Sequence, residues 1–88
     1  RTTENYVSGC QSAVWITVKK DNGVWDIKTD SDAFMVKGIA KLVAEVATPD
    51  PNAIRFGDFH SITRNLTVQR QRGMQAIINR IRLLTEGK

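Results

Sequence analysis

The feature that most constrains the fold is the tetrapeptide Asp21-Asn22-Gly23-Val24, which separates two stretches of alternating apolar and polar residues. Asn-Gly is a strong signal for a two-residue type I′ turn, because both turn positions require a positive φ angle. Before the turn, Val14, Ile16 and Val18 occupy every second position, which is typical of a strand with one buried face. The turn and the pattern together predict a β-hairpin.

The position of the turn determines which residues lie opposite each other across the hairpin. Outward from the turn, the predicted pairs are Lys20 with Trp25, Lys19 with Asp26, Val18 with Ile27, and Ile16 with Thr29. The apolar residues of the first strand then share one face with the apolar residues of the second. Because a two-stranded sheet is only marginally stable, we expect residues Glu4 to Ser8 to add a third antiparallel strand.

The first of two expected helices follows the hairpin. Asp30 or Ser31 suits its N-cap, and Asp32 would place a negative charge in its first turn. The helix is expected to end at Thr48-Pro49-Asp50-Pro51. Its apolar stripe comprises Val36, Ile39, Ala40, Val43 and Ala47. Phe34 falls on the polar side, where it either covers a neighbouring loop, the interpretation we favour, or touches a partner.

The second expected helix begins after Thr67, which suits an N-cap. Its apolar stripe comprises Met74, Ile77, Ile78, Ile81 and Leu84. Arg70 lies on the same line as this stripe. An arginine there either extends its stem along the edge of the core or meets an anionic partner. Residues 52–66 between the helices read as irregular, with Phe59 among the apolar side chains available to the core.

These elements predict an α+β fold, with a small three-stranded antiparallel sheet followed by two main α-helices packed on it. The 88 residues are expected to form a single domain, 1–88, and 41% hydrophobic with 25% charged residues is typical of a globular protein. No membrane span is expected, because Lys41 and Glu45 interrupt the longest apolar stretch. Because the outer sheet face is apolar near Trp15, we expect the chain to self-associate, to exchange segments between copies, or to be less stable than a longer chain.

The single cysteine, Cys10, lies between the expected third strand and the first hairpin strand, directly after Gly9. A lone thiol forms no internal disulfide, so it is either a reactive group or a small buried apolar side chain. His60 is the only histidine. It could act as a base for Cys10, or it could have a surface or capping role. A thiol-dependent enzyme that uses Cys10 with His60 therefore remains an alternative.

The net charge of +4 raises the question of nucleic-acid binding, because five arginines fall after residue 63. The sequence has no helix-turn-helix spacing, no pair of stacking aromatic residues on a sheet face and no set of zinc ligands. A solvated basic face is the favoured interpretation, and a basic nucleic-acid-binding module is kept as an alternative.

Two motifs resemble the SufE family of sulfur-acceptor proteins. The run Gly9-Cys10-Gln11-Ser12-Ala13-Val14-Trp15 is similar to the family's segment around its sulfur-accepting cysteine. The run Asp30-Ser31-Asp32-Ala33, followed by Val36-Lys37-Gly38, is similar to the family's helix start. Both motifs are specific, and they occur in the family's order.

A third, weaker motif is Leu66-Thr67 followed by Arg70 and Gly73, with Gln69 where the family usually has serine. The resemblance then extends from about Asn5 to the last helix. The family also has an N-terminal helical segment without a counterpart in this sequence, so we expect the chain to be N-terminally truncated or processed.

The resemblance implies a sulfur acceptor in iron–sulfur cluster assembly that activates a cysteine desulfurase and is not itself an enzyme. Cys10 would take persulfide sulfur from the desulfurase and pass it to a scaffold protein, and Arg70 would support this site. The resemblance implies no cofactor or metal on this chain, because the pyridoxal phosphate belongs to the desulfurase. One cysteine without a disulfide framework fits a reducing compartment, so we expect a cytoplasmic protein, or an organellar one in a eukaryote, with no nucleic-acid or membrane partner.

Overall fold

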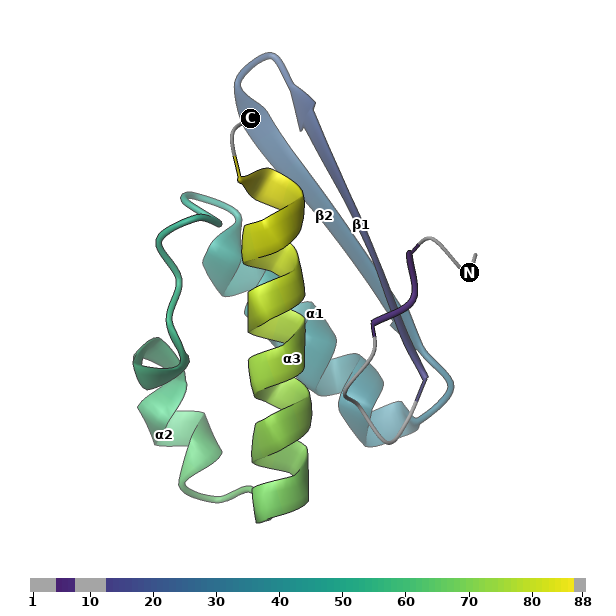
Figure 1. Ribbon diagram of the computed structural model, residues 1–88, viewed down its shortest axis with the longest axis vertical. Helices are drawn as coiled ribbons and strands as arrows, with labels where there is room; N and C mark the ends of the chain where they lie inside the picture. Colours follow the sequence, from purple (N-terminus) through teal and green to yellow (C-terminus); the bar gives the residue numbers. More distant parts are fainter. Residues whose placement is uncertain (1–4, 8–12, 87–88) are drawn as a thin grey trace.

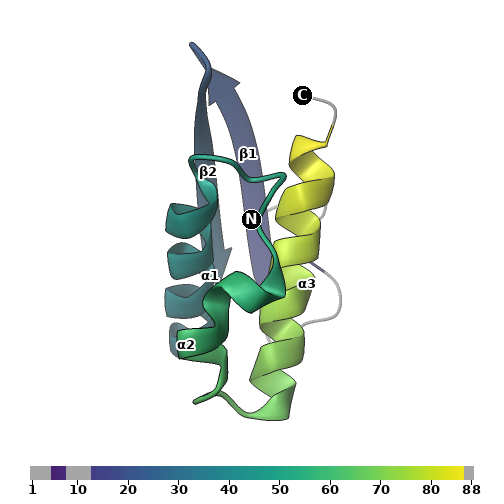
Figure 2. The same ribbon diagram turned by 90° about the vertical axis from the view of Figure 1, so that its left-hand side faces the viewer.

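The computed structural model describes residues 5–7 and 13–86. The elements in chain order are β1 (Val14–Asp21), β2 (Val24–Ser31), α1 (Phe34–Ala47), the 3₁₀ turn η2 (Phe56–Phe59), α2 (His60–Thr63) and α3 (Val68–Thr85). The hairpin forms one layer, and α1 and α3 lie on one face of it (Figures 1 and 2). α1 packs mainly against β2, and α3 packs against β1 and α1. The expected α+β class is thus observed.

The hairpin has the predicted turn and register. Asn22 and Gly23 have φ angles of 51° and 79°, as a type I′ turn requires. The β1 and β2 partners include Lys20 with Trp25, Lys19 with Asp26, Val18 with Ile27 and Ile16 with Thr29. Val14 and Ile16 are fully buried on the face toward the helices. The turn sequence therefore predicted this element correctly.

The predicted three-stranded sheet is wrong, because the described sheet has two strands. The segment before β1 contributes only an isolated bridge between Tyr6 and Trp15, with the Val7 N–H donating to the Val14 carbonyl at 2.7 Å. Asn5 lies in a 3₁₀ turn, so the chain leaves the extended conformation directly before the bridge. The Tyr6 ring packs edge-on against the Trp15 ring, with 5.9 Å between the ring centroids, and partly covers it.

The start of α1 also differs from the prediction. β2 continues through Ser31, and the helix begins at Phe34 with Ala33 as its N-cap residue. Phe34 does not cover a neighbouring loop, because it is 91% exposed. The predicted end and the inner face are confirmed: α1 stops at Ala47 and buries Ala40, Val43, Ala44 and Ala47.

The segment before α3 is more ordered than the sequence suggested. The stretch read as irregular contains η2 and α2, and Phe59 is 1% exposed between them. The side-chain amide of Gln71 donates to the carbonyls of Thr63 and Leu66, both at 3.0 Å, which fixes the connection into α3. The Thr67 hydroxyl caps α3 by accepting the Arg70 N–H at 3.3 Å.

The core lies between the hairpin and the two long helices. Its buried members are Val7, Val14, Ile16, Ala40, Val43, Ala47, Ile54, Phe59, Met74, Ile77, Ile78 and Ile81. The two alanines of α1 and the three isoleucines of α3 in this set make the helix faces complementary, since small side chains leave room for large ones. None of the helices within residues 5–7 and 13–86 has the length and apolar character needed to cross a bilayer.

Two glycine substitutions should change stability in opposite directions. Gly23→Ala is expected to lower the free energy of unfolding by about 1–2 kcal/mol, since a Cβ is strained at a φ of 79°. Gly38→Ala is expected to raise it by about 0.5–1 kcal/mol, because Gly38 lies inside α1 with nothing within 4 Å of the added Cβ. Urea unfolding measures the change in the free energy of unfolding for each variant. A Gly23→Ala protein as stable as the parent would contradict the type I′ turn.

Candidate functional site

The predicted reactive residue, Cys10, lies outside the described residues. The nearest described residues on its two sides are Val7 and Ala13. Both lie at the open end of the hairpin, opposite the turn at Asn22-Gly23, since Val7 bonds to Val14 and Ala13 directly precedes β1. Val7 is 2% exposed, so its side chain is held in the core. This open end of the hairpin is the candidate functional site.

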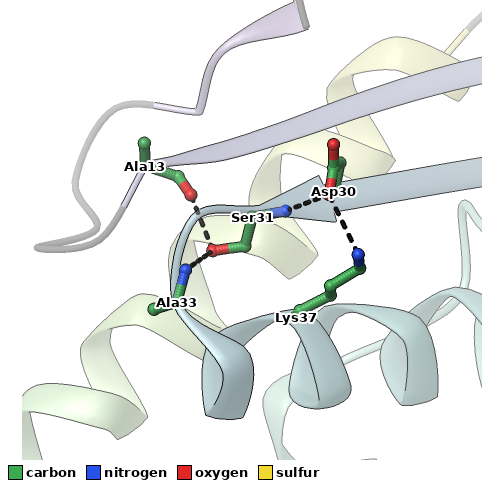
Figure 3. Close-up of polar contacts among 5 residues, drawn as sticks. All are labelled: Ala13, Asp30, Ser31, Ala33 and Lys37. Atoms are coloured by element: carbon green, nitrogen blue, oxygen red, sulfur yellow. Dashed lines mark hydrogen bonds and ion pairs between the residues drawn. The ribbon is translucent and has the colours of Figure 1, made fainter.

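Ala13 is held to the junction between β2 and α1 by three hydrogen bonds. Its N–H donates to Oδ1 of Asp32 at 3.1 Å. Its carbonyl accepts the Ser31 hydroxyl at 2.7 Å and the Asp32 N–H at 3.3 Å. Figure 3 shows the Ser31 hydroxyl directed at the Ala13 carbonyl. We call Ser31 and Asp32 the Ala13 clamp.

The same junction is tied to the first turn of α1 (Figure 3). The Ser31 hydroxyl accepts the Ala33 N–H at 3.2 Å, and Oδ1 of Asp30 accepts the Ser31 N–H at 2.9 Å. The ammonium of Lys37 lies 3.5 Å from the Asp30 carboxylate, in a largely exposed pair that contributes little to stability. Ser31 is 4% exposed, so its hydroxyl bonds count for more, at about 0.5–1.5 kcal/mol each.

Ser31 and Asp32, which the sequence suggested for the capped start of the helix, have other roles in the structure. Asp32 lies before α1 and bonds to Ala13, so it is not in the first helical turn. Ser31 precedes the N-cap residue and bridges two backbone segments that lie far apart in the sequence. Within Asp30-Ser31-Asp32-Ala33, the first three side chains therefore form a joint between Ala13 and α1. Only the motif itself signalled that these residues act together.

Arg70 lies in the first turn of α3 and is half-buried. The start of α3 and the open end of the hairpin lie in the same half of the molecule, and the hairpin turn lies in the other (Figure 1). Within the described part of the chain, the Arg70 guanidinium makes no hydrogen bond or ion pair. Arg72, by contrast, is exposed.

His60 begins α2 and is exposed. α2 lies on the far side of α3 from the hairpin (Figure 1), and its main contacts are with η2. The structure therefore does not bring His60 to Val7 or Ala13, the residues that flank the cysteine segment. This placement weighs against pairing His60 with Cys10 in a thiol-dependent enzyme.

Among residues 5–7 and 13–86, no three side chains of histidine, cysteine, aspartate or glutamate come together in a group that could hold a metal ion.

The fold and the clamp define a small α+β domain in which Ser31 and Asp32 hold Ala13 at the junction of β2 and α1. Residues 1–85 match the family model of the SufE Fe–S metabolism associated domain. The chain belongs to the SufE family, as the sequence motifs indicated, and this family is associated with iron–sulfur metabolism.

Proposed function

We propose that the chain accepts sulfur on Cys10 from a pyridoxal-phosphate-dependent cysteine desulfurase and passes it on for iron–sulfur cluster assembly. The observation that carries this proposal is the match to the SufE family across residues 1–85, which includes the only cysteine of the chain. The chain then acts as a sulfur carrier and activator. Its partners are the desulfurase and a cluster scaffold, and the pyridoxal phosphate stays on the desulfurase.

The arrangement of the flanking residues supports this role. Three peptide units separate Cys10 from Val7 and three separate it from Ala13, which limits each separation to about 11 Å even for an extended chain. Val7 is held by the core and Ala13 by the clamp. A sulfur carrier needs a thiol that is presented from a fixed position yet reaches a partner's active site, and two fixed flanks meet both needs.

The proposed transfer is a thiol exchange that needs no added oxidant. The Cys10 thiolate attacks the outer sulfur of the desulfurase persulfide, so that a new sulfur–sulfur bond forms on Cys10 as the old one breaks. The desulfurase cysteine leaves as a thiolate and regains a proton. Because a persulfide is readily oxidised, the proposal also places the chain in a reducing compartment, the cytoplasm or a eukaryotic organelle.

Arg70 is proposed to support this transfer. The Arg70 guanidinium makes no hydrogen bond or ion pair with the described residues, and a guanidinium at the core edge can steady a thiolate, a persulfide or a carboxylate of the desulfurase. Arg70→Ala is expected to slow sulfur transfer by about tenfold, equal to about 1.4 kcal/mol, and to change the melting temperature little. Arg72→Ala is the matched control, and Arg70→Lys should restore part of the rate. A large loss of stability with normal transfer would instead assign Arg70 to the core.

The proposed function is tested by incubating the chain with a cysteine desulfurase and free cysteine. Sulfur on the chain is followed by intact mass, and desulfurase turnover is followed by the release of alanine. Both readouts should respond to Cys10 and neither should depend on His60.

A further inference from the structure

β2 has one edge without a strand partner among the described residues. β2 pairs with β1 along its other edge, so the unpaired edge of β2 is an edge of the described sheet. In an antiparallel pair, alternate residues direct their N–H and C=O groups toward the partner strand. The bond from the Asp32 N–H to the Ala13 carbonyl shows that the even-numbered residues of β2 direct their backbone N–H and C=O groups toward β1. Trp25, Ile27 and Thr29 therefore direct their backbone groups to the free edge.

A groove runs beside this edge, between β2 and α1. It has a volume of about 540 Å³. The strand side is formed by Ile27, Lys28 and Thr29, and the helix side by Lys37, Lys41, Ala44, Glu45 and Thr48. Open backbone groups next to a groove are the arrangement that accepts an added strand, whose main chain pairs with the edge while its side chains fill the groove.

We propose that the occupant is β2 of a second copy of this chain, paired antiparallel across a twofold axis at Ile27. In this register Asp26 lies opposite Lys28 of the second copy, and Lys28 lies opposite its Asp26. Two opposite-charge pairs thus form by symmetry, and such cross-strand pairs stabilise a sheet. The backbone groups of Trp25, Ile27 and Thr29 then all find partners.

Neighbouring registers are less favourable. A shift that centres the axis on Asp26 or on Lys28 places like charges opposite each other. An axis that falls between two residues would place odd-numbered residues opposite even-numbered ones. Backbone groups directed to the new strand would then lie opposite groups directed to β1, so the ladder cannot form. An axis at Thr29 would require the Ser31 N–H, which already donates to the Asp30 carboxylate at 2.9 Å. Among these registers, only the axis at Ile27 places opposite charges across from each other without competing for the Ser31 N–H.

The helices leave room for this pairing. α1 runs back along β2 from its Ser31 end, and the hairpin extends past α1 toward the turn (Figure 2). The twofold axis would place the second α1 along the opposite half of the new sheet. Trp25 of the second copy would lie opposite Thr29, beside the groove, and Val24, which is 63% exposed, would lie opposite Asp30. The pairing therefore covers apolar surface near the hairpin turn.

The expected dimer is weak, since one strand pair and one groove bury less than about 1,200 Å². Sedimentation equilibrium over a range of chain concentrations, with reductant present to exclude a Cys10 disulfide, should show a monomer–dimer equilibrium. Lys28→Glu should be monomeric at concentrations where the parent is mostly dimeric. Arg72→Glu, which makes the same charge change on an exposed part of α3, should dimerise like the parent.

A charge-exchanged variant tests the register itself. Asp26→Lys combined with Lys28→Asp restores opposite charges across the axis and should recover the dimer lost in Lys28→Glu. Position 26 lies opposite Lys19 within the hairpin, so Asp26→Lys places two lysines across from each other. Melting curves are therefore measured to check that each variant is folded. A parent that stays monomeric at every concentration would overturn the proposal. Equal dimerisation of Lys28→Glu, or no recovery in a folded exchanged variant, would overturn it as well.

Discussion

Replacing Cys10 by serine is expected to abolish stimulation of a cysteine desulfurase, leaving only the turnover of the desulfurase alone. A serine hydroxyl cannot form the sulfur–sulfur bond through which a persulfide is accepted. Stability should change little, because a serine side chain is nearly the same size as a cysteine side chain. The measurement is alanine release by the desulfurase, with and without the variant.

His60→Ala is the control for Cys10→Ser. His60 lies on α2, away from the residues that flank Cys10, so its removal should leave desulfurase stimulation unchanged. If Cys10→Ser stimulates as well as the parent, Cys10 is not the acceptor. If His60→Ala loses activity while remaining folded, the alternative of a Cys10–His60 thiol enzyme gains support.

Replacing Phe59 by alanine is expected to have the largest effect on stability. Phe59 is 1% exposed in the segment between the two long helices, where its ring is a member of the core. Removing a buried phenylalanine typically costs about 3–5 kcal/mol, because the apolar contact is lost and a cavity remains. The total free energy of unfolding of a small domain is about 5–15 kcal/mol, so this variant should be close to unfolding.

Urea unfolding of Phe59→Ala and Phe34→Ala provides a matched comparison. Phe34 is 91% exposed at the start of α1, and its replacement should change the free energy of unfolding by no more than about 0.5 kcal/mol. Similar losses in both variants would show that Phe59 is not held in the core. Such a result would also contradict the described packing of η2 and α2.

Local signals in the sequence predicted the hairpin and the inner faces of both long helices. Asn22-Gly23 specifies both the turn and the register, because a slip by one residue would expose Val14 and Ile16. The apolar stripe on α3 follows the helical period, and the Thr67 cap marks its start. These features depend on neighbours in the sequence, which is why they could be read without a structure.

Features that depend on distant residues were predicted less well. The third strand was inferred from the marginal stability of two strands, but the segment before β1 leaves the extended conformation at Asn5. Ser31 and Asp32 have the residue types of a helix cap. In the fold their side chains bond to Ala13, eighteen or nineteen positions earlier in the sequence.

The site could be predicted only in part for the same reason. The motif around Cys10 and the Asp30-Ser31-Asp32-Ala33 motif identified the family and the cysteine. They did not indicate that the second motif holds Ala13, because this contact exists only after the hairpin has closed. The placement of His60 on the far side of α3 likewise follows from helix packing, which spacing in the sequence does not encode.

Intact mass spectrometry tests the central claim most directly. The chain is incubated with a cysteine desulfurase and free cysteine, and its mass is measured without reductant and again after reduction. The sulfur-acceptor function predicts a gain of one sulfur atom that maps to Cys10, disappears on reduction and is absent from Cys10→Ser. An unchanged mass in the presence of an active desulfurase, or the same gain in Cys10→Ser, would contradict it.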